Sequence, residues 1–310
     1  MKLWFMGKTK FFIVLSCIII LAGVVAYIVF GGLNLGIDFT GGSIFTIEMG
    51  STYNDQDINN ALSANSVDLA TTQVVSGSSG TEAIIRMQKL PQNVSAVDLR
   101  QSIIKSLTTK YPNVVAGEIE HVGGVTSGEI VTNAFMSVLI ASALILIYIW
   151  IRFTLYSGIA GVVALVHDVL VMTAFVCLAR IEINSPYIAA CLTILGYSIN
   201  DTIVVFDRIR ENNKKYSLKE KTRAQIADQS IVETLPRTIN TSLTVLMMIT
   251  SVYIFGVPSI KTFTLPLIVG LISGTYSSIF IATPIWIWLE DARDKRKQFS
   301  KPAVASKSKA

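Results

Sequence analysis

Residues Leu192–Asn212 read LTILGYSINDTIVVFDRIREN, which places a carboxylate inside a stretch otherwise apolar enough to cross a membrane. The part from Tyr187 to Phe206 has about 20 residues, enough at helical rise to span a hydrocarbon layer about 30 Å thick. Asp201 lies about 9 Å from its end. A carboxylate there is costly unless it faces the bundle interior or water, which makes Asp201 a candidate functional residue. The alternative is that Asp201 only hydrogen-bonds a neighbouring helix.

The composition extends this interpretation to the whole chain. Hydrophobic residues make up 51% of the 310 residues and charged residues 15%, more apolar side chain than a soluble core of this size needs. The stretches long enough to span are Phe11–Phe30, Val131–Ile151, Phe153–Ala179, Tyr187–Phe206, Thr238–Val257 and Phe263–Leu289. The sequence therefore predicts a membrane α-helical bundle of six transmembrane helices.

The positive charges orient this bundle. With an even number of spans and a cytoplasmic start, 19 of the 26 Lys and Arg residues lie on the cytoplasmic side, as the positive-inside rule favours. All four tryptophans fall near the predicted inner interface. We expect a multi-pass protein of the cytoplasmic membrane with both termini cytoplasmic. Its basic segments can contact anionic membrane lipid, and the net charge of +5 requires no nucleic acid.

The first span and the cysteines exclude two other classes. The first apolar run is longer than the core of a signal peptide and lacks a small-residue cleavage site, so we interpret it as a retained anchor. Cys17, Cys177 and Cys191 all lie within predicted spans. They offer neither a disulfide framework nor the ligand spacing of a metal site.

One exported domain is expected between the first two spans, over residues 38–128. The predicted strands are Asp38–Met49, Leu69–Ser76, Thr81–Met87 and Val114–Val122, and the predicted helices are Asn54–Asn65 and Ser95–Tyr111, with a hairpin turn at Gly77–Gly80. The resulting β-α-β-β-α-β order is that of a ferredoxin-like α+β domain. We find no catalytic cluster in it, and we interpret His121 as a partly exposed strand residue.

The remaining segments follow from these boundaries. The predicted organisation is 1–37, cytoplasmic N-terminus and transmembrane helix 1; 38–128, exported domain; 129–206, transmembrane helices 2–4; 207–237, cytoplasmic connector; 238–289, transmembrane helices 5–6; and 290–310, basic cytoplasmic tail. In the connector, Ser217–Glu220 has the pattern of a capping box and predicts the start of an amphipathic helix.

A glycine-rich motif, LGIDFTGG at Leu35–Gly42, lies where the first span meets the exported domain. It lacks the Lys-Ser/Thr of a P-loop and the third glycine of a dinucleotide fingerprint, so we predict no nucleotide or other cofactor there. Gly36 ends the approach from the first helix, and Asp38 lies in the hydrated headgroup zone. Gly41 and Gly42 allow the first strand to bend or another chain segment to come close.

Four segments together carry a family resemblance. They are GIDFTGG (Gly36–Gly42), VALVHDVLV (Val163–Val171), LTILGYSINDTIVVFDRIREN (Leu192–Asn212) and ETLPRTINTSLTVL (Glu233–Leu246). With them, the chain resembles the SecF subunits of the SecDF accessory complex in bacterial Sec protein export, over nearly its whole length. The resemblance implies a transport subunit that is not an enzyme and that uses the proton or sodium motive force. It also implies a SecD-like subunit, the SecYEG channel and unfolded preproteins as partners.

The resemblance also bears on the candidate site. It implies that Asp201 and Arg237 are linked to proton passage and that the GIDFTGG motif couples the first helix to the exported domain. Arg237 follows Pro236 and could extend toward the depth of Asp201, although an arginine at a helix end usually reaches for the interface. His167 and Asp168 lie in the third span, where Asp168 is either part of a buried, partnered pair or a relay group.

Two other functions remain open at this stage. One is half of a resistance-nodulation-division exporter of small molecules or lipids, which normally carries twelve spans and two exported domains in one chain. The other is a scaffold whose polar membrane residues only hold helices together. The pattern GLISG at Gly270–Gly274, followed by Ser277 and Ser278, suits close helix packing within the bundle or against a partner.

Overall fold

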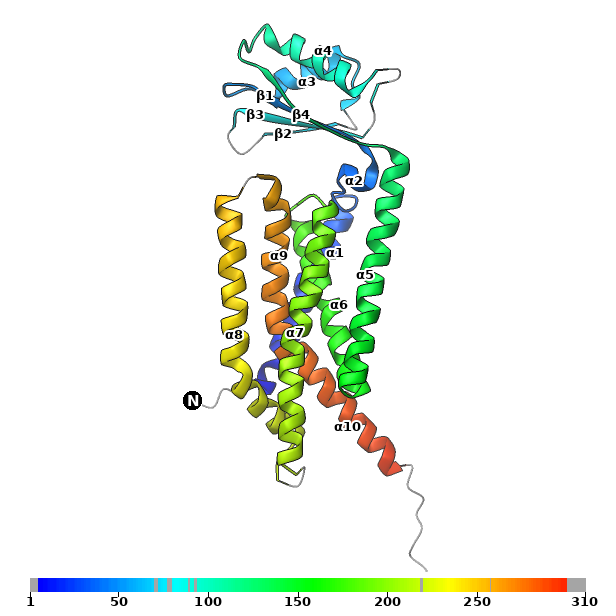
Figure 1. Ribbon diagram of the computed structural model, residues 1–310, viewed down its shortest axis with the longest axis vertical. Coiled ribbons are helices and arrows are strands. Elements are labelled where there is room, and N and C mark those ends of the chain that lie inside the picture. The colour runs from blue at the N-terminus through cyan, green and yellow to red at the C-terminus, as the bar shows by residue number, and fades with distance from the viewer. Residues whose placement is uncertain are drawn as a thin grey trace, which may run out of the picture.

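A computed structural model describes residues 5–69, 72–76, 80–88, 90–91, 94–217, 220–256 and 258–299. It consists of a bundle of long helices with a small α+β domain at one end (Figure 1). The predicted hairpin turn at Gly77–Gly80 lies largely outside the described residues.

The bundle contains the six predicted spans. The helices are α1 (Thr9–Val29), α5 (Gly124–Arg152), α6 (Leu155–Leu178), α7 (Ser185–Lys215), α8 (Arg223–Phe255), and α9 (Pro258–Ser277) continued by α10 (Thr283–Phe299). Within the described residues, six helical stretches are long and apolar enough to cross a membrane. The helices α7 and α8 continue beyond the predicted spans, so most of the predicted cytoplasmic connector is helical.

Between α9 and α10 the last span is interrupted by a π-helical turn, Ser278–Ala282, whose residues are all buried. The hydroxyl of Thr283 donates to the carbonyl of Ser278 at 2.9 Å, and Ser278 Oγ lies 2.9 Å from Thr202 Oγ1 on α7. Turns of this kind occur mostly as local interruptions of α-helices, often at functional sites.

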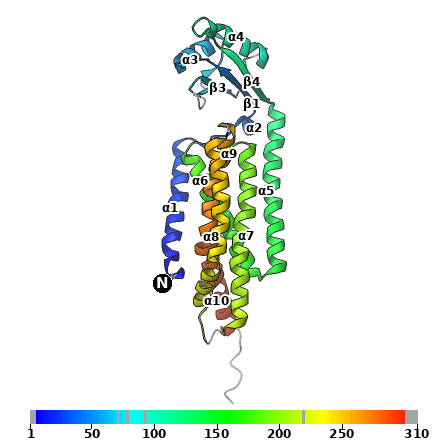
Figure 2. The same ribbon diagram turned by 60° about the vertical axis from the view of Figure 1, so that its left-hand side comes forward.

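The α+β domain between the first two spans, predicted to be exported, has the predicted element order. Its elements are β1 (Gly42–Glu48), α3 (Asp55–Ala64), β2 (Thr72–Ser76), β3 (Glu82–Met87), α4 (Ala96–Thr108) and β4 (Val115–Val122). The strands form an antiparallel sheet in the order β2-β3-β1-β4, which is the ferredoxin-like topology. Asn54 and Ser95 cap the two helices, as residues of their types favour. Helices α3 and α4 cover the sheet face that points away from the bundle, so the other face looks toward it (Figure 2).

One local prediction is wrong, and another is confirmed in part. The first strand begins at Gly42 rather than Asp38, because Ile37–Thr40 form a short helix, α2. The segment Ser217–Glu220 forms one of the two bonds of a capping box, since the backbone N–H of Ser217 donates to Glu220 Oε2 at 3.2 Å, and a complete capping box is formed by Thr222 and Gln225 at the start of α8.

The interior of the bundle is formed by α6, α7 and α9. The apolar, membrane-spanning parts of α1, α5 and α8 are largely exposed. Close contact of α9 with α7 requires small residues. A Cβ on Gly270 would lie 2.6 Å from Ile194 Cγ1, and one on Gly274 would lie 2.9 Å from Ser198 Cβ. The GLISG pattern therefore serves packing within the bundle.

Candidate ion-coupling site

A carboxylate lies at the centre of the bundle, where α6, α7 and α9 meet. Asp168 on α6 has no exposed surface. Its Oδ2 accepts hydrogen bonds from Ser198 Oγ at 2.5 Å and Ser277 Oγ at 2.8 Å. Its Oδ1 accepts from Ser273 Oγ at 2.8 Å and from His167 Nδ1 at 3.0 Å. The four donors come from all three interior helices.

This arrangement satisfies the carboxylate of Asp168 completely. An ionised carboxylate offers about four acceptor positions, and four donors occupy them. A buried charge is tolerated when hydrogen bonds compensate its lost hydration. The arrangement is that of a buried, fully partnered group that holds three helices in register.

His167 extends this network to the first helix. Its Nε2 lies 3.2 Å from the hydroxyl of Tyr276 on α9, and that hydroxyl lies 3.1 Å from Ser16 Oγ on α1. Ser16 is buried although most of α1 is exposed. A run of polar groups therefore leads from α1 to Asp168.

The second carboxylate, Asp201 on α7, has a different environment. It is 5% exposed, and its recorded side-chain hydrogen bond comes from Ser242 Oγ on α8 at 3.3 Å. Ser242 in turn accepts a hydrogen bond from Thr275 Oγ1 on α9 at 2.9 Å. Asp201 is thus almost as buried as Asp168 but, among the described residues, its side chain has one long hydrogen bond in place of four. Such a carboxylate can gain a proton or a cation without breaking a filled network.

Arg237, the predicted partner of Asp201, lies on α8 with its side chain exposed on the outside of the bundle. None of the ion pairs between described residues joins it to Asp201. Pro236 lies within the helix rather than at its end. A direct contact between the two side chains would therefore require a movement of α7 relative to α8, or of the side chains themselves.

Sequence reasoning missed the donors on α9. Ser273 and Ser277 are four residues apart and so share a helix face, which points at Asp168, whereas Thr275 points toward Ser242. The spacing of these hydroxyls was the available signal. It was assigned to close packing alone, because small polar residues serve both purposes in membrane helices.

The junction motif connects the exported domain to α7, the helix that carries Asp201. Asp38 Oδ2 accepts a hydrogen bond from the backbone N–H of Ser185 at 2.7 Å, in the first turn of α7. Gly41 and Gly42 have φ values of +70° and +138°, and a Cβ on Gly42 would lie 2.3 Å from the carbonyl of Met87. Only glycine allows β3 to come this close to the start of β1. A carboxylate at a helix N-terminus is also favoured by the helix dipole.

Comparison with known protein families identifies this arrangement. The family model described as "Protein export membrane protein SecD/SecF, C-terminal" matches residues 102–292, and that of the SecD/SecF GG motif matches residues 26–52. The chain belongs to the SecD/SecF family. The second match covers the junction motif, and the first includes Asp168, Asp201 and Arg237.

Individual relatives agree with this membership in the SecD/SecF family. The protein translocase subunit SecF of Sebaldella termitidis is 38% identical over 269 residues, 86% of this chain and 85% of the relative. SecF of Desulfurispirillum indicum is 40% identical over 260 residues, 83% of this chain and 82% of the relative. The chain is accordingly a SecF-type subunit in protein export, a transporter rather than an enzyme. This membership favours protein export over a small-molecule or lipid exporter.

Fused relatives contain this chain's counterpart as part of a longer protein. SecDF of Bacillus subtilis is 36% identical over 286 residues, which are 91% of this chain and 37% of the relative. The crystal structure of SecDF, a translocon-associated membrane protein from Thermus thermophilus, aligns with a TM-score of 0.83 at 30% identity. That alignment covers 94% of this chain and 39% of SecDF. Partnership with a SecD-type half is implied by these fusions.

Proposed function

We propose that this subunit uses the proton or sodium motive force, together with a SecD-type partner, to promote export of unfolded preproteins through the Sec translocon channel. In this proposal Asp201 is the group that takes up and releases the ion, and Arg237 is its charge partner. Asp168 is the fixed anchor against which α7 moves. Both termini and the α7–α8 extension face the cytoplasm, and the exported domain contacts the emerging chain on the other side.

The observation that carries the proposal is that one bundle holds a carboxylate whose hydrogen-bond positions are all filled, Asp168, and one with few donors, Asp201. A lone carboxylate in low dielectric must pair, bind an ion or become neutral. Asp201 has few fixed donors, so its environment changes when an ion arrives or leaves. The energy available suits such a cycle, because one charge moved through 100 mV supplies about 2.3 kcal/mol.

A route from this event to the exported domain is present in the same helix. Asp201 lies on α7, and the first turn of α7 is bound by Asp38 of the junction motif. Displacement or rotation of α7 would therefore move the segment where the exported domain begins. This connection supports a mechanical role for the motif and assigns no chemistry to it.

The test uses membrane vesicles that contain the chain, its SecD-type partner and the translocon channel, with an imposed proton or sodium gradient. Asp201→Asn keeps the shape but cannot bind or release the ion as a carboxylate. It should abolish gradient-dependent stimulation of preprotein transport at normal protein levels. Glu211→Gln, an exposed carboxylate near the end of the same helix, is the matched control and should leave stimulation unchanged. Full stimulation with Asp201→Asn would favour a scaffold role instead.

The orientation has its own test. Single cysteines at Ser102, in α4, and at Lys215, at the end of α7, are placed in a chain lacking the three native cysteines. A membrane-impermeant thiol reagent added from outside should label the first and not the second. Labelling of both from the same side would contradict the proposed topology.

A further inference from the structure

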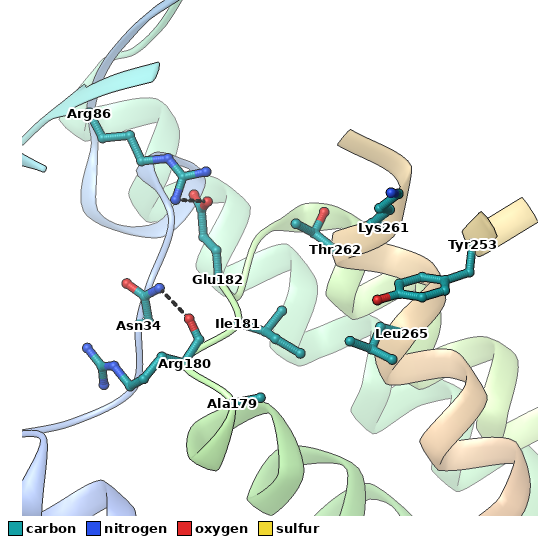
Figure 3. A pocket seen from close by; sticks show the side chains of 10 residues that line it. All are labelled: Asn34, Arg86, Ala179, Arg180, Ile181, Glu182, Tyr253, Lys261, Thr262 and Leu265. Atoms are coloured by element: carbon teal, nitrogen blue, oxygen red, sulfur yellow. Dashed lines mark hydrogen bonds and ion pairs between the residues drawn. The ribbon is translucent and has the colours of Figure 1, made fainter. Parts of the chain in front are cut away.

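An ion pair connects the open face of the exported domain to the bundle. Arg86 on β3 contacts Glu182, in the loop between α6 and α7, with 2.5 Å between Nη1 and Oε2 (Figure 3). The side chain of Glu182 is only 8% exposed and that of Arg86 24%. Among the ion pairs between described residues, it is the one that joins the exported domain to the bundle. Glu182 comes shortly before Asn184, the capping residue of α7.

Gly36 of the junction motif lies directly against the side chain of Glu182. Gly36 has φ −74° and ψ 170°, a conformation that any residue adopts, so its backbone does not require glycine. A Cβ at this position, however, would lie 2.5 Å from Glu182 Oε1. The backbone N–H of Gly36 also donates to the carbonyl of Ile183 at 2.8 Å. The missing side chain of Gly36 thus provides the space in which Glu182 lies.

A cleft lies next to this contact. A cleft of about 480 Å³ opens beside the ion pair, between Arg86 and the outer ends of α8 and α9, where Tyr253, Lys261 and Leu265 line it (Figure 3). Across this gap the exported domain and the bundle are separated. The Arg86–Glu182 contact is therefore well placed to fix the distance between them.

We propose that Glu182 is a positioning residue that ties the exported domain, through Arg86, to the outer end of α7, so that movement of α7 is transmitted to the domain. The inference deepens the proposed function and rests on it for its transport readout. Without this tie, α7 would still be connected to the domain through the junction motif and α5. The ion cycle at Asp201 would then continue while most of its effect on export was lost.

The surroundings of Glu182 indicate which variant is conservative. Arg86 faces it from β3, and the carboxylates of Asp38 on α2 and Glu120 on β4 act on it as like charges. Burial is the largest influence and raises the pKa of Glu182, although Arg86 acts in the opposite direction. A neutral side chain of the same length is therefore acceptable here. Glu182→Gln retains the reach and still accepts a hydrogen bond from Arg86, whereas Glu182→Ala retains neither.

The first experiment compares export with ion flux in vesicles that contain the complete complex. Arg86→Ala and Glu182→Ala should lose most of the gradient-dependent stimulation of export while ion flux through the complex persists. Glu182→Gln should retain both. Lys110→Ala breaks an ion pair of 2.7 Å within the exported domain and is the matched control, expected to behave as the native chain.

The second experiment uses Gly36. Gly36→Ala should displace Glu182 and uncouple export as Arg86→Ala does. Combined with Glu182→Ala, it should add no further loss, because the atoms it would meet have been removed. An additive loss would show that Gly36 acts independently of Glu182 and would overturn this part of the inference.

A distance measurement makes the inference testable apart from transport. Spin labels at Ser102 on α4 and at Phe255, an exposed residue at the outer end of α8, report the separation of domain and bundle. The distance distribution should broaden in Arg86→Ala and Glu182→Ala, and stay narrow in Glu182→Gln and Lys110→Ala. Unchanged distances and unchanged stimulation in both alanine variants would overturn the inference. Broadened distances with stimulation that is also insensitive to Asp201→Asn would instead overturn the proposed function.

Discussion

Asp168 and Asp201 occupy the same bundle, on neighbouring helices and at nearly the same burial, yet their surroundings differ. Asp168 accepts four hydrogen bonds from three helices, whereas the recorded side-chain hydrogen bond of Asp201 is one of 3.3 Å. Burial alone therefore does not distinguish a structural carboxylate from a functional one. The number of hydrogen-bond donors to the carboxylate distinguishes them, because a carboxylate with all its hydrogen bonds made resists uptake of an ion, whereas one with few hydrogen bonds permits it.

The largest effect is expected from deleting the anchor. Asp168→Ala removes the acceptor of three serines and a histidine; Ser277 Oγ keeps a hydrogen bond to the carbonyl of Gly274, whereas the other donors lose the acceptor that Asp168 provides. Because each such group costs about 1–3 kcal/mol, we expect a loss of roughly 4 kcal/mol in stability. Thermal unfolding of the purified complex and the amount of protein in the membrane measure it. Asp201→Ala is the comparison and should change both much less; equal losses would remove the distinction between the two carboxylates.

Arg237 tests whether Asp201 has a charge partner. Arg237→Gln should eliminate most gradient-dependent export, and Arg237→Lys should retain part of it, since the charge remains while the planar, wider-reaching guanidinium is lost. The measurement is stimulation in vesicles at matched protein levels. Arg293→Gln, which removes a half-buried arginine on α10 paired with Glu290, serves as control. If Arg237→Gln were as active as the control, Asp201 would have to cycle without this partner.

Single hydroxyl deletions sharpen the comparison further. Ser273→Ala or Ser277→Ala removes one of four donors to Asp168 and should lower stability by about 1 kcal/mol with little change in stimulation. Ser242→Ala, which removes a donor to Asp201, should change stability little and lower the gradient-dependent stimulation of export. Unfolding temperature and stimulation are measured on the same preparations. A uniform response of all three variants would contradict separate roles.

The smallest expected effect concerns pH at the outer face. The pKa of Glu182 is raised above its ordinary value of 4.5, so the folded protein holds its proton to higher pH than the unfolded chain does. The stability from this group is fully present below 4.5 and is lost as pH rises through the raised value. Unfolding temperature should therefore fall across this window, and Glu182→Gln should remove that part of the slope. An identical slope in both proteins would contradict the burial argument.

Much of this architecture could be predicted from the sequence. The six spans and the ferredoxin-like order follow from apolar length and strand alternation, which are local properties. Asp201 and Asp168 stand out because carboxylates are rare in membrane helices. Their different environments could not be predicted, because Ser273, Ser277 and Ser242 reach them from helices far away in sequence. The short helix α2 was missed for a related reason, since Asp38 is held by the distant backbone of Ser185.

The π-helical turn Ser278–Ala282 fixes how α10 is rotated about the helix axis relative to α9. Each residue of an α-helix turns the chain by about 100°, so one additional residue in a turn rotates everything beyond it by that amount. The turn lets Ser273 and Ser277 face Asp168 while Trp286, one turn beyond it, joins the apolar cluster around Phe206. An uninterrupted α-helix would have to give up one of these orientations. The last span thus packs against its neighbours with one helix face before the π-helical turn and with a different face after it.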